Sequence, residues 1–546
     1  MADTSDPLRG QLSFGIDLGT TNSGIAGWSE EQGRAVMLPG LDGSPLLPSV
    51  VGWDRERQVW VVGCEAEALR RDVPRQVAYS VKRFIGRSFD DPEVCIGRQE
   101  MPYTLVRGDS ADLRRTVAID FGGPRLSVPE VSARVLAQLR RHAADALSLP
   151  DTAVRHVVIT VPAYFNNNQR QATRLAGELA GWEVVDLVDE PTAAALACGD
   201  SVLGTEEKLL LVCDLGGGTF DVSLLKASRD EIGYCFRTRA VDGDTRLGGH
   251  DIDTAVARWL AAEVERLHGQ PLRAPDHALR DRLRRTAEQA KVALSAQEAV
   301  EVELLGPDVS GAASVPVRVS LDRRRLEECA GAVRRQMREI VRRAVVDVAG
   351  LKWELLGEVI LVGGQTLMPA VRRDLQELTG RRPYTVEQPQ LAVALGAATY
   401  AHILSLGRER FHENTLINVL ALALGIRLDD NTFEQLVPAN ATVPYTSRPF
   451  AVTTTEDNQT FIRVEVLQGS RHARGADECV VLGSIEMEVP PAPARKLRFD
   501  VQFGVRSDGT LKVEVMDPRR DRREVLDILD GRVLAWRDET EAAPLD

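Results

Sequence analysis

Two segments of this sequence place a carboxylate directly before a loop of small residues. Asp17 lies in FGIDLGTTNSGIAGW (14–28) and Asp214 lies in LLLVCDLGGGTFDVSLL (209–225), each after a run of apolar β-forming residues. Gly and Thr side chains are small enough for a polyphosphate to reach the backbone N–H groups of a hairpin tip. Mg²⁺ takes few protein ligands and keeps several of its waters, so the two carboxylates are suited to hold it. The repeat therefore predicts two similar lobes that face one another across a phosphate site.

Each loop also has a plainer interpretation. A strand, a glycine-containing turn and a return strand are what any β-hairpin needs, so either loop alone is compatible with an ordinary turn. Two copies at matching places in the two halves are harder to explain by turns alone. We therefore interpret the two segments as a pair of phosphate loops.

The chain around these loops alternates between strand-like and helix-like patterns. A β-rich run at 156–162 is followed by a helical pattern at 166–182 and by another β-rich run at 183–191. This alternation continues to about residue 405 and favours an α/β architecture with partly parallel sheets. The strands of such sheets would position the two carboxylates and their loops.

Two later stretches complete the organisation. The stretch 358–380 contains a strand, Gly363 and Gly364, and a helix, and the helix N-terminus is a favourable place for a nucleoside or phosphate. From 420 to 517 short alternating segments are separated by turn signals, which predicts an antiparallel β-sandwich. The apolar junction 415–424 is either the first strand of that sandwich or a docking linker.

The bulk properties exclude several classes of protein. A length of 546 residues suggests roughly three or four structural units. A formal net charge of −13 and a pI near 5.3 argue against sequence-independent binding of nucleic acid. The seven cysteines are scattered without C-x-x-C spacing, which argues against a disulfide framework or a zinc site. Residues 1–13 lack the apolar core of a signal peptide and no apolar run is long enough to span a membrane, so we expect a cytoplasmic protein.

The motifs together resemble those of the heat-shock protein 70 (DnaK-type) molecular chaperones. The resemblance covers about residues 12–517, and it depends on the number and order of the motifs rather than on any one of them. In chain order they are GIDLGTTNS (15–23), KRFIGR (82–87), VITVPAYFN (158–166), DEPTAAALA (189–197), DLGGGTFDVS (214–223), RLGGHDID (246–253), ILVGGQTLMP (360–369), AVALGAA (392–398) and TEDNQT (455–460).

The resemblance implies an α/β fold in which a two-lobed, actin-like (hexokinase/actin-type) ATPase domain is followed by an antiparallel β-sandwich. The nucleotide-binding domain would span 12–405, an interdomain linker 406–419 and a substrate-binding domain 420–517. A short C-terminal tail, 518–546, would follow. Because only 29 residues remain after Asp517, we expect no helical lid and at most one short helix there.

The resemblance also implies a role for each motif residue in binding and hydrolysing ATP. Lys82 matches the catalytic lysine, and Glu190 would orient the attacking water. By themselves, Lys82 could be a solvated surface lysine and Glu190 a helix-start carboxylate. Asp17 and Asp214 would hold Mg²⁺ through water and, with Asp221, organise any monovalent cation such as K⁺. The residues expected on the β- and γ-phosphates are Gly19, Thr20, Thr21 and Asn22 in one loop, and Gly216, Gly217, Gly218 and Thr219 in the other. Thr219 is also expected to be a catalytic residue.

The nucleoside contacts depart from the family pattern. Glu288, Lys291 and Ser295 fit the family's ribose and adenine contacts, as Gly363 and Gly364 fit the nucleoside loop. Val292 and Leu367, however, stand where two arginines usually stack on the base. An arginine on an aromatic face contributes roughly 0.5–2 kcal/mol. We therefore expect looser binding of ATP and ADP than is typical of the family.

The β-sandwich resembles the family's peptide-binding domain, which holds an extended apolar peptide by main-chain hydrogen bonds and one apolar pocket. About half of the matching residues would be core residues in any β-sandwich. Asp429 stands at an apolar position of the family's groove, which disfavours closure over a peptide. The matching residues are Ile426, Leu428, Val452, Gln459, Ile462 and Val464.

Residues that couple the two domains match in part. Pro162 and Arg170 match the family's route from nucleotide to partner domain, whereas Asn418 replaces the usual linker aspartate. Asp186 replaces an arginine that faces the J-domain co-chaperone, so we expect a dedicated J-domain partner or none. His250 replaces an acidic residue, and we expect it to lie at the surface or to pack between subdomains rather than bind metal.

These features predict an ATP-dependent chaperone that binds extended apolar segments of unfolded proteins, assisted by co-chaperones and a nucleotide exchange factor. The main alternative is a nucleotide-gated binding module with little or no ATP turnover. A small-molecule kinase or filament-forming relative on the same fold is disfavoured, because those proteins have no β-sandwich after the linker.

Overall fold

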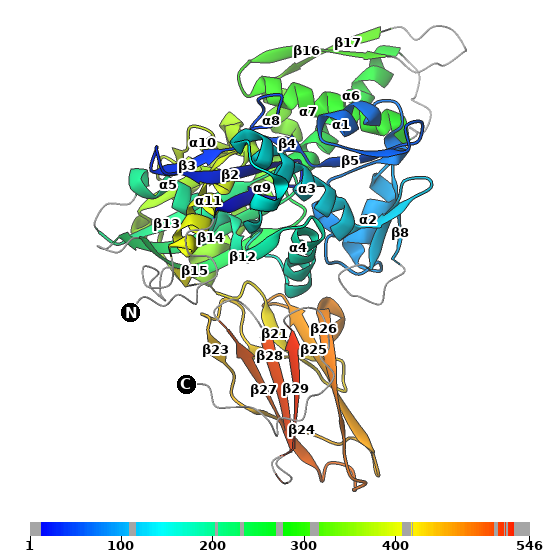
Figure 1. Ribbon diagram of the computed structural model, residues 1–546, viewed down its shortest axis with the longest axis vertical. Coiled ribbons are helices and arrows are strands. Elements are labelled where there is room, and N and C mark those ends of the chain that lie inside the picture. Colours follow the sequence, from blue (N-terminus) through cyan, green and yellow to red (C-terminus); the bar gives the residue numbers. More distant parts are fainter. Residues whose placement is uncertain are drawn as a thin grey trace. The chain divides into compact units, whose positions relative to one another are not determined.

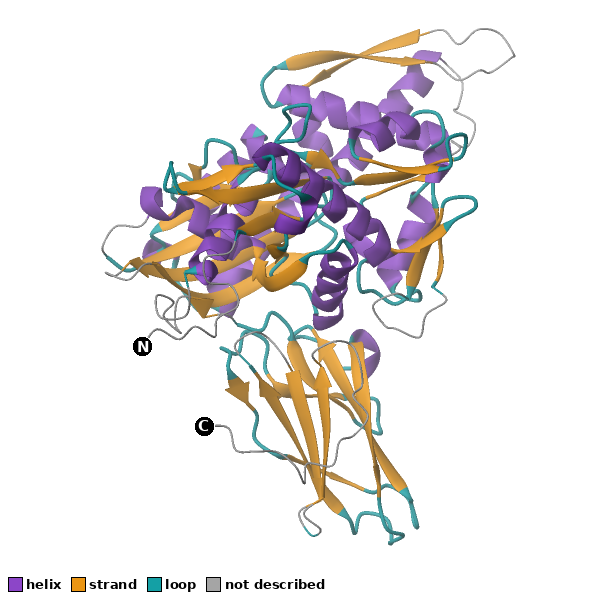
Figure 2. Ribbon diagram, viewed as in Figure 1, coloured by secondary structure: helices purple, strands orange, loops and turns teal. Residues whose placement is uncertain are grey.

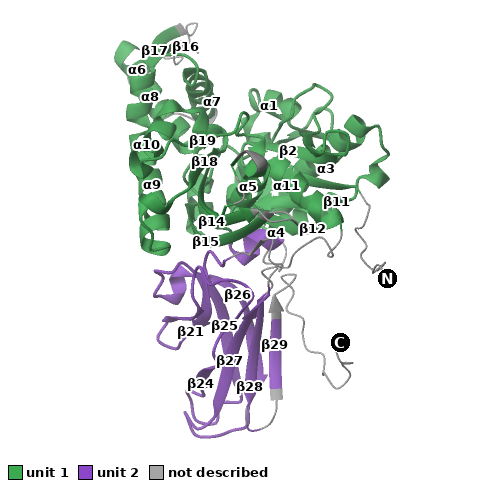
Figure 3. Cartoon of the chain, turned by 90° about the vertical axis from the view of Figure 1, so that its left-hand side faces the viewer, with its two compact units in different colours: residues 1–165, 172–416 green, residues 166–171, 417–546 purple. Residues whose placement is uncertain are grey.

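The structure is a computed structural model of the chain. The chain divides into two compact units, which Figure 3 shows in two colours: residues 1–165 with 172–416, and residues 166–171 with 417–546. Asn418 and most of the predicted linker lie outside the described residues. The described residues are 12–108, 116–202, 206–229, 234–268, 277–305, 316–406, 416–417, 419–506, 511–517, 519 and 522–528.

The first unit contains two lobes, each built on a central sheet (Figure 1). In the first lobe β1 runs parallel to β11 and antiparallel to β2. Every residue of β11 is buried, as expected for a strand covered on both faces. In order across the sheet, the strands are β12 (Glu183–Asp189), β11 (His156–Val161), β1 (Ser13–Asp17), β2 (Asn22–Ser29) and β3 (Arg34–Met37).

The second lobe repeats this arrangement. Strand β13 runs parallel to β18 and antiparallel to β14, so it takes the place that β1 has in the first lobe. Five of the six strands of its sheet follow the order β19 (Tyr384–Thr385), β18 (Glu358–Val362), β13 (Lys208–Leu215), β14 (Phe220–Arg229) and β15 (Tyr234–Asp244). The predicted pair of similar α/β lobes is confirmed.

Smaller sheets and helices surround the central sheets (Figure 2). In the first lobe, helix α3 begins after Ser127, whose backbone N–H donates to the Glu130 carboxylate at 2.7 Å and so satisfies an otherwise free donor. The first lobe adds β4 (Leu47–Pro48), β5 (Val50–Asp54), β6 (Val59–Val62), β7 (Val77–Tyr79), β8 (Thr104–Arg107), β9 (Val117–Asp120), β10 (Arg125–Ser127), α1 (Cys64–Arg70), α2 (Pro92–Glu100) and α3 (Val128–Leu147). Helix α4 (Asn167–Leu179) is divided, since residues 167–171 belong to the second unit and residues 172–179 to the first. The second lobe adds α5 (Glu190–Val202), α6 (Gly249–His268), α7 (His277–Leu294), β16 (Ala299–Leu305), β17 (Pro316–Asp322), α8 (Arg323–Cys329), α9 (Gly331–Arg342) and α10 (Pro369–Thr379).

Helix α11 (Ala392–Ser405) packs against β1 and α5 at very short range. A Cβ atom on Gly15 would meet the Ala398 nitrogen at 2.0 Å, and a Cβ on Gly396 would meet the Ala193 carbonyl oxygen at 1.7 Å. Only glycine leaves room for backbone at these distances. The two glycines therefore fix the close packing of α5, α11 and the first sheet.

The second unit is an antiparallel β-sandwich, as predicted. One sheet has the order β22-β21-β25-β26, and the other has the order β23-β27-β28-β29 with β24 paired to β27. Alternate side chains of β27, including Phe499, Val501 and Phe503, are buried in the core between the sheets. The strands are β21 (Ala423–Arg427), β22 (Phe433–Val437), β23 (Tyr445–Thr446), β24 (Phe450–Thr453), β25 (Phe461–Gly469), β26 (Val480–Glu488), β27 (Arg498–Val505), β28 (Leu511–Asp517) and β29 (Arg522–Ile528).

Strand β29 corrects the sequence-based boundary. We expected the β domain to end at Asp517, with at most a short helix beyond it. Instead, Arg522–Ile528 pairs antiparallel with β28, and Leu526 is buried in the sandwich core. An unpaired strand edge exposes backbone donors and acceptors, and the extra strand satisfies those of β28.

None of the helices within the described residues is both long enough and apolar enough to cross a lipid bilayer.

We expect Gly396→Ala to destabilise the first unit. Alanine has the better helix propensity by about 1 kcal/mol, but overlap with the Ala193 carbonyl outweighs this gain, for a net loss of about 1–3 kcal/mol. Urea unfolding measures the change. Gly123→Ala is the matched control, because nothing lies within 4 Å of a Cβ there. Equal stability of both variants would contradict the packing described for α11.

Candidate functional site

A cavity of about 260 Å³ lies between the two lobes of the first unit. Its lining comes from the tips of both hairpins, from the segment around Lys82, from α7 and from the loop after β18. Of the residues predicted to bind or hydrolyse nucleotide, those that line it are Asp17, Gly19, Thr20, Thr21, Asn22, Lys82, Glu190, Asp214, Gly216, Gly217, Thr219, Glu288, Lys291, Gly363 and Gly364. Gly218, Asp221 and Ser295 do not line it.

The two predicted phosphate loops lie against one another. A Cβ atom on Gly217 would meet the Thr21 hydroxyl at 2.0 Å, and one on Gly218 would meet the Thr20 methyl at 2.6 Å. Any side chain at either glycine would push the loops apart. Close approach of the lobes, as well as access to phosphate, thus requires glycine at these positions.

Buried hydroxyl groups hold the first loop in shape. The Gly19 N–H donates to the Ser23 hydroxyl at 3.1 Å, and Ser23 lies 2.9 Å from the Ser49 hydroxyl. Ser49 donates to the Gly19 carbonyl at 2.8 Å, and its own N–H donates to the Thr21 carbonyl at 2.8 Å. Two serines thereby fix the loop backbone before any ligand binds.

Lys82 lies among the carboxylates at the floor of the cavity. Its ammonium group donates to a carboxylate oxygen of Glu190 at 2.5 Å, and both side chains are buried. Asp17 accepts a hydrogen bond from Thr160 at 3.4 Å, and Asp214 is buried opposite it at the tip of the second hairpin. The Lys82 ammonium group therefore faces several acids on the cavity wall.

This crowding shifts the acid equilibria. Burial, reinforced by the negative charge of Glu190, raises the pKa of Asp17 to about 7. Burial and the charges of Glu190 and Asp17 raise the pKa of Asp214 well above its ordinary value. Burial acts to lower the pKa of Lys82, but attraction to Glu190 and Asp17 outweighs it, and the pKa is raised. Lys82 thus stays charged, while the carboxylates retain an excess of negative charge.

The donor set fits magnesium held through its water shell. Asp17 and Asp214 offer hard oxygen atoms on opposite walls of the cavity. Within the described part of the chain, no three His, Cys, Asp or Glu side chains are grouped to ligate one ion directly. A hydrated divalent cation needs fewer direct ligands and would neutralise the excess charge that raises the pKa of both carboxyl groups.

Asp221 lies behind the cavity rather than on its wall. It is the register partner of Asp214 in the β13–β14 hairpin, and it accepts a hydrogen bond from the Tyr164 N–H at 3.2 Å. Burial, followed by the charge of Glu190, raises the pKa of Asp221 to about 8. The structure therefore supports an electrostatic influence on the site more than direct contact with a ligand.

The end of the cavity predicted to hold the nucleoside has one polar pair and two open apolar positions. Lys291 forms an ion pair with the buried Asp253 at 2.8 Å. Val292 is 63% exposed and Leu367 is 46% exposed, although both line the cavity. The Ser295 hydroxyl donates a hydrogen bond to the Lys291 carbonyl at 3.5 Å. A flat base could cover these exposed apolar groups.

Several lining residues were not identified as site residues from the sequence. Asp253 and His250 lie in the RLGGHDID motif, so the signal was present but was not assigned to the site. Gln365 and Gln390 lie beside predicted residues without a distinctive pattern. Ser49 could not be found, because it reaches Gly19 only through the fold.

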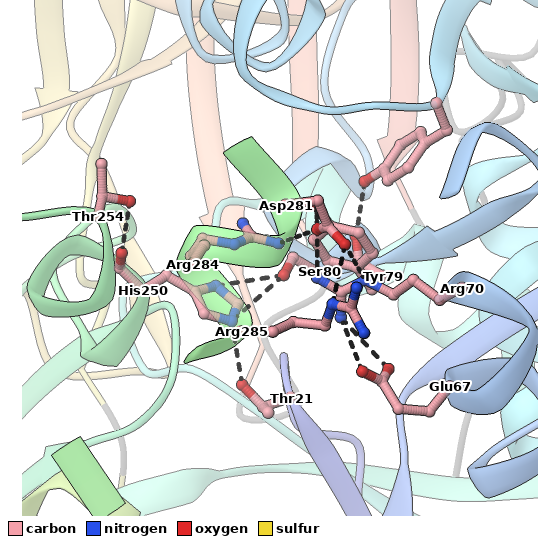
Figure 4. Close-up of polar contacts among 11 residues, drawn as sticks. Thr21, Glu67, Arg70, Tyr79, Ser80, His250, Thr254, Asp281, Arg284 and Arg285 are labelled. Atoms are coloured by element: carbon pink, nitrogen blue, oxygen red, sulfur yellow. Dashed lines mark hydrogen bonds and ion pairs between the residues drawn. The ribbon is translucent and has the colours of Figure 1, made fainter. Parts of the chain in front are cut away.

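His250 connects the two lobes at the edge of the cavity. Its ring nitrogens lie 3.4 Å from the Thr21 hydroxyl and 3.2 Å from the Ser80 hydroxyl, and the side chain is buried (Figure 4). Burial, followed by the positive charge of Arg83, lowers the pKa of His250 well below its ordinary value. Of the two expected roles, a surface position is wrong because the side chain is buried, and packing between subdomains agrees with these contacts.

The residues expected to couple the domains have varied surroundings. Pro162 is buried after β11, and Arg170 is half-buried on α4. Asp186 accepts a hydrogen bond from the Tyr400 hydroxyl at 2.8 Å. Its carboxylate is thus engaged within its own unit, which limits the charge it can offer to a partner. Asn418 lies outside the described residues.

Of the predicted peptide-binding residues, Ile426, Ile462 and Val464 are buried in the sandwich core. Leu428 and Val452 are half-buried against that core. The Gln459 side chain closes its own turn by accepting from the Thr455 N–H and donating to the Phe461 carbonyl. Their role in binding peptide stays a prediction.

Two facing lobes, each with a carboxylate-bearing hairpin, followed in the chain by an antiparallel β-sandwich, define the fold of an actin-like nucleotide-binding domain with an attached β domain. The family model described as Hsp70 protein matches residues 13–542. The chain belongs to the Hsp70 family. It is 36% identical over 524 residues to the Chaperone protein DnaK of Stenotrophomonas maltophilia (strain R551-3), a match that covers 96% of this chain and 79% of that protein.

We expect Val292→Arg with Leu367→Arg to tighten binding of ADP by about one to three decades, because each guanidinium can stack on the base. Isothermal titration calorimetry measures the affinity. Val346→Arg is the control, since Val346 is also exposed but does not line the cavity. Tight binding by the unmodified chain, with a nanomolar dissociation constant, would contradict the predicted loose site.

A second prediction concerns pH. Asp17 and Asp221 have pKa values of about 7 and about 8 in the folded chain, against about 4 in an unfolded chain. Between about pH 4 and about pH 8 the folded state thus binds more protons than the unfolded state. The free energy of unfolding therefore falls as the pH rises through this range. Mg²⁺ held by the ionised carboxylates should offset this loss, so Mg²⁺ should raise the melting temperature more at pH 8 than at pH 6.

Thermal unfolding at fixed ADP, with Mg²⁺ or with a chelator, measures this difference. Asp17→Asn should reduce it, whereas Asp430→Asn, a change to an exposed acid of the sandwich, should leave it intact. An equal effect of Mg²⁺ at both pH values would count against the predicted magnesium site.

Proposed function

We propose that this protein is an ATP-dependent molecular chaperone that binds extended apolar segments of unfolded proteins. The observation that carries the proposal is the cavity between the lobes, where Lys82 and Glu190 face Asp17 and Asp214 beside two touching phosphate loops. Membership of the Hsp70 family and similarity to a protein named as the chaperone DnaK support the same assignment.

Positioning and charge would carry the hydrolysis of ATP to ADP and phosphate. The Lys82 ammonium stabilises negative charge on the terminal phosphoryl oxygens, and burial strengthens that interaction. One carboxylate oxygen of Glu190 accepts a hydrogen bond from Lys82. This contact fixes the carboxylate, so that its other oxygen can orient a water molecule. The backbone of the loop held by Ser49 presents its N–H groups without reorganisation. Bound Mg²⁺ would supply further charge neutralisation at the phosphates.

The β-sandwich would supply peptide binding. Because Ile426, Ile462 and Val464 are covered in this structure, an extended peptide could reach them only after neighbouring loops move. Leu428 and Val452, which are half-buried, would be contacted first. ATP binding and hydrolysis would bias this opening, and differential affinity for the two states is what such a switch requires.

The altered nucleoside end favours one alternative. With Val292 and Leu367 exposed in place of stacking groups, weak nucleotide binding would suit a nucleotide-gated binding module with little turnover. We infer a dedicated J-domain partner or none, because Asp186 carries the opposite charge to the family's usual arginine. A nucleotide exchange factor and K⁺ complete the proposed requirements.

Single-turnover hydrolysis separates the chaperone ATPase from the non-hydrolysing module. We expect Lys82→Ala to lower the rate at least about a hundredfold, because the charge on the terminal phosphoryl group loses its buried partner. Lys226→Ala, at a half-exposed lysine paired with Glu207, is the control. Thermal unfolding of both variants confirms that they are folded. An unmodified chain that does not hydrolyse ATP would support the module instead.

Peptide release tests the switch. A fluorescent Leu-rich peptide bound to the full chain should dissociate faster after addition of ATP, and Lys82→Ala should still show this effect because it depends on ATP binding. Fluorescence anisotropy against an excess of unlabelled peptide gives the rate. A release rate independent of nucleotide would contradict the proposed coupling, and failure to bind the peptide would contradict the chaperone assignment.

A further inference from the structure

A second and larger cavity, of about 600 Å³, lies in the first unit beside the proposed nucleotide site. Five arginines and three carboxylates line it, so we call it the arginine cavity. Its volume falls within the range of about 300–1,000 Å³ that is usual for small-molecule sites. The five arginines are Arg83, Arg246, Arg258, Arg280 and Arg284.

The carboxylates of the arginine cavity are already engaged. Asp281 accepts hydrogen bonds from Arg70 at 2.6 Å, Tyr79 at 2.9 Å and Arg284 at 3.2 Å, and it also pairs with Arg285 at 3.2 Å (Figure 4). Although burial acts to raise the pKa of Asp281, the charge of Arg70 and the hydrogen bonds lower it, so the group is ionised. One carboxylate with three guanidinium groups around it leaves positive charge in excess.

The other two acids are committed in the same way. Asp251 pairs with Arg83 at 3.2 Å and accepts from the Gly248 N–H at 2.9 Å. Glu100 lies 3.7 Å from Arg246. The side chain of Arg83 is only 8% exposed, yet its Nε donor has no hydrogen-bond acceptor among the residues that the structure describes.

Two arginines of the cavity remain open to a ligand. Arg258 on α6 and Arg280 on α7 are exposed, and within the described ranges neither has an ion-pair or hydrogen-bond partner. Both come from the second lobe. An anion entering the cavity could therefore meet guanidinium groups that need not first break another contact.

Part of the cavity wall is apolar. Met101, Leu283 and Val333 are buried side chains that line it, and Ala255 and Ala261 of α6 add small apolar surfaces. A purely inorganic ion would leave this surface wet. An anion with an apolar body would match both parts of the lining.

We propose that the arginine cavity binds a small organic anion with an apolar body, such as an aryl sulfonate, carboxylate or phosphate ester, and that the ligand links the two lobes. The link follows from the lining, because Tyr79 and Met101 belong to the first lobe, whereas Arg258 and Leu283 belong to the second. A ligand that contacts both lobes stabilises the arrangement in which they are together.

His250 connects this cavity with the proposed nucleotide site. Among the described residues that line the two cavities, His250 alone lines both. It also reaches Thr21 of the first phosphate loop at 3.4 Å. Binding in the arginine cavity and binding of nucleotide are therefore expected to reinforce one another, and each must then raise the affinity for the other by the same factor.

The probe for the test is 8-anilinonaphthalene-1-sulfonate, and its uncharged analogue N-phenyl-1-naphthylamine is the control ligand. We expect saturable binding of the sulfonate to the full chain and much weaker binding of the analogue, both measured by fluorescence. The double variant Arg258→Glu with Arg280→Glu should weaken sulfonate binding at least roughly tenfold. Arg372→Glu, at an exposed arginine of α10 outside the cavity, should leave it unchanged.

Cysteine alkylation places the probe. Cys329 lines the arginine cavity, whereas the exposed Cys64 and Cys95 do not. The sulfonate should slow reaction of Cys329 with iodoacetamide, measured peptide by peptide with mass spectrometry, and should not slow Cys64 or Cys95. Binding that is equally strong in the double variant, equally strong for the uncharged analogue, or without protection of Cys329 would overturn the proposed site.

The link between lobes has its own measurement, which rests on the proposed nucleotide site. Saturating sulfonate should slow release of radiolabelled ADP severalfold in the unmodified chain and not in the double variant. Unchanged ADP release alongside confirmed protection of Cys329 would overturn the link between lobes. If ADP does not bind at all, the proposed nucleotide function fails, while the alkylation result still decides the anion site.

Discussion

The proposed chemistry depends on one buried ammonium group held among carboxylates. Lys82 is fixed to Glu190 and lies close enough to Asp17 to lower the cost of its ionisation, yet one positive charge does not neutralise the group. Burial and the charge of Glu190 raise the pKa of both Asp17 and Asp214, and the charge of Asp17 adds to the effect on Asp214. Such a site gains most from a ligand that brings cations with it. A hydrated metal with a polyphosphate meets that requirement, and the touching phosphate loops supply the matching backbone donors.

The rest of the first unit keeps this arrangement rigid. The loops can meet only because glycine stands opposite Thr20 and Thr21, and the Ser23 and Ser49 hydroxyl groups tie the first loop to the strand that follows it. Close packing of α11 on β1 at Gly15, and of α11 on α5 at Gly396, fixes the sheet from which Asp17 projects. Small residues and hydroxyl groups thus keep this site rigid, because they allow one backbone segment to approach another more closely than larger side chains would.

The structure departs from a simple nucleotide-gated peptide binder at its periphery. Val292 and Leu367 leave the nucleoside end apolar and open, and Asp186 is hydrogen-bonded to Tyr400 instead of lying free for a partner. The excess of arginine in the neighbouring cavity offers another way to hold the lobes together. Weak stacking on the base would lower the affinity for nucleotide. An anion that bridges the lobes would slow the release of nucleotide and so compensate for that loss.

Local pattern was sufficient for the hairpins, for the lobes and for the β-sandwich, because apolar periodicity and glycine turns are properties of short segments. Asp17 and Asp214 could be paired in advance because their segments resemble each other. Other features depend on residues far apart in the chain: the Ser49 contact with Gly19, the pKa shifts around Lys82, and the strand after Asp517 that pairs with β28. Burial and long-range contact depend on how separate segments pack, and no window of sequence contains that information.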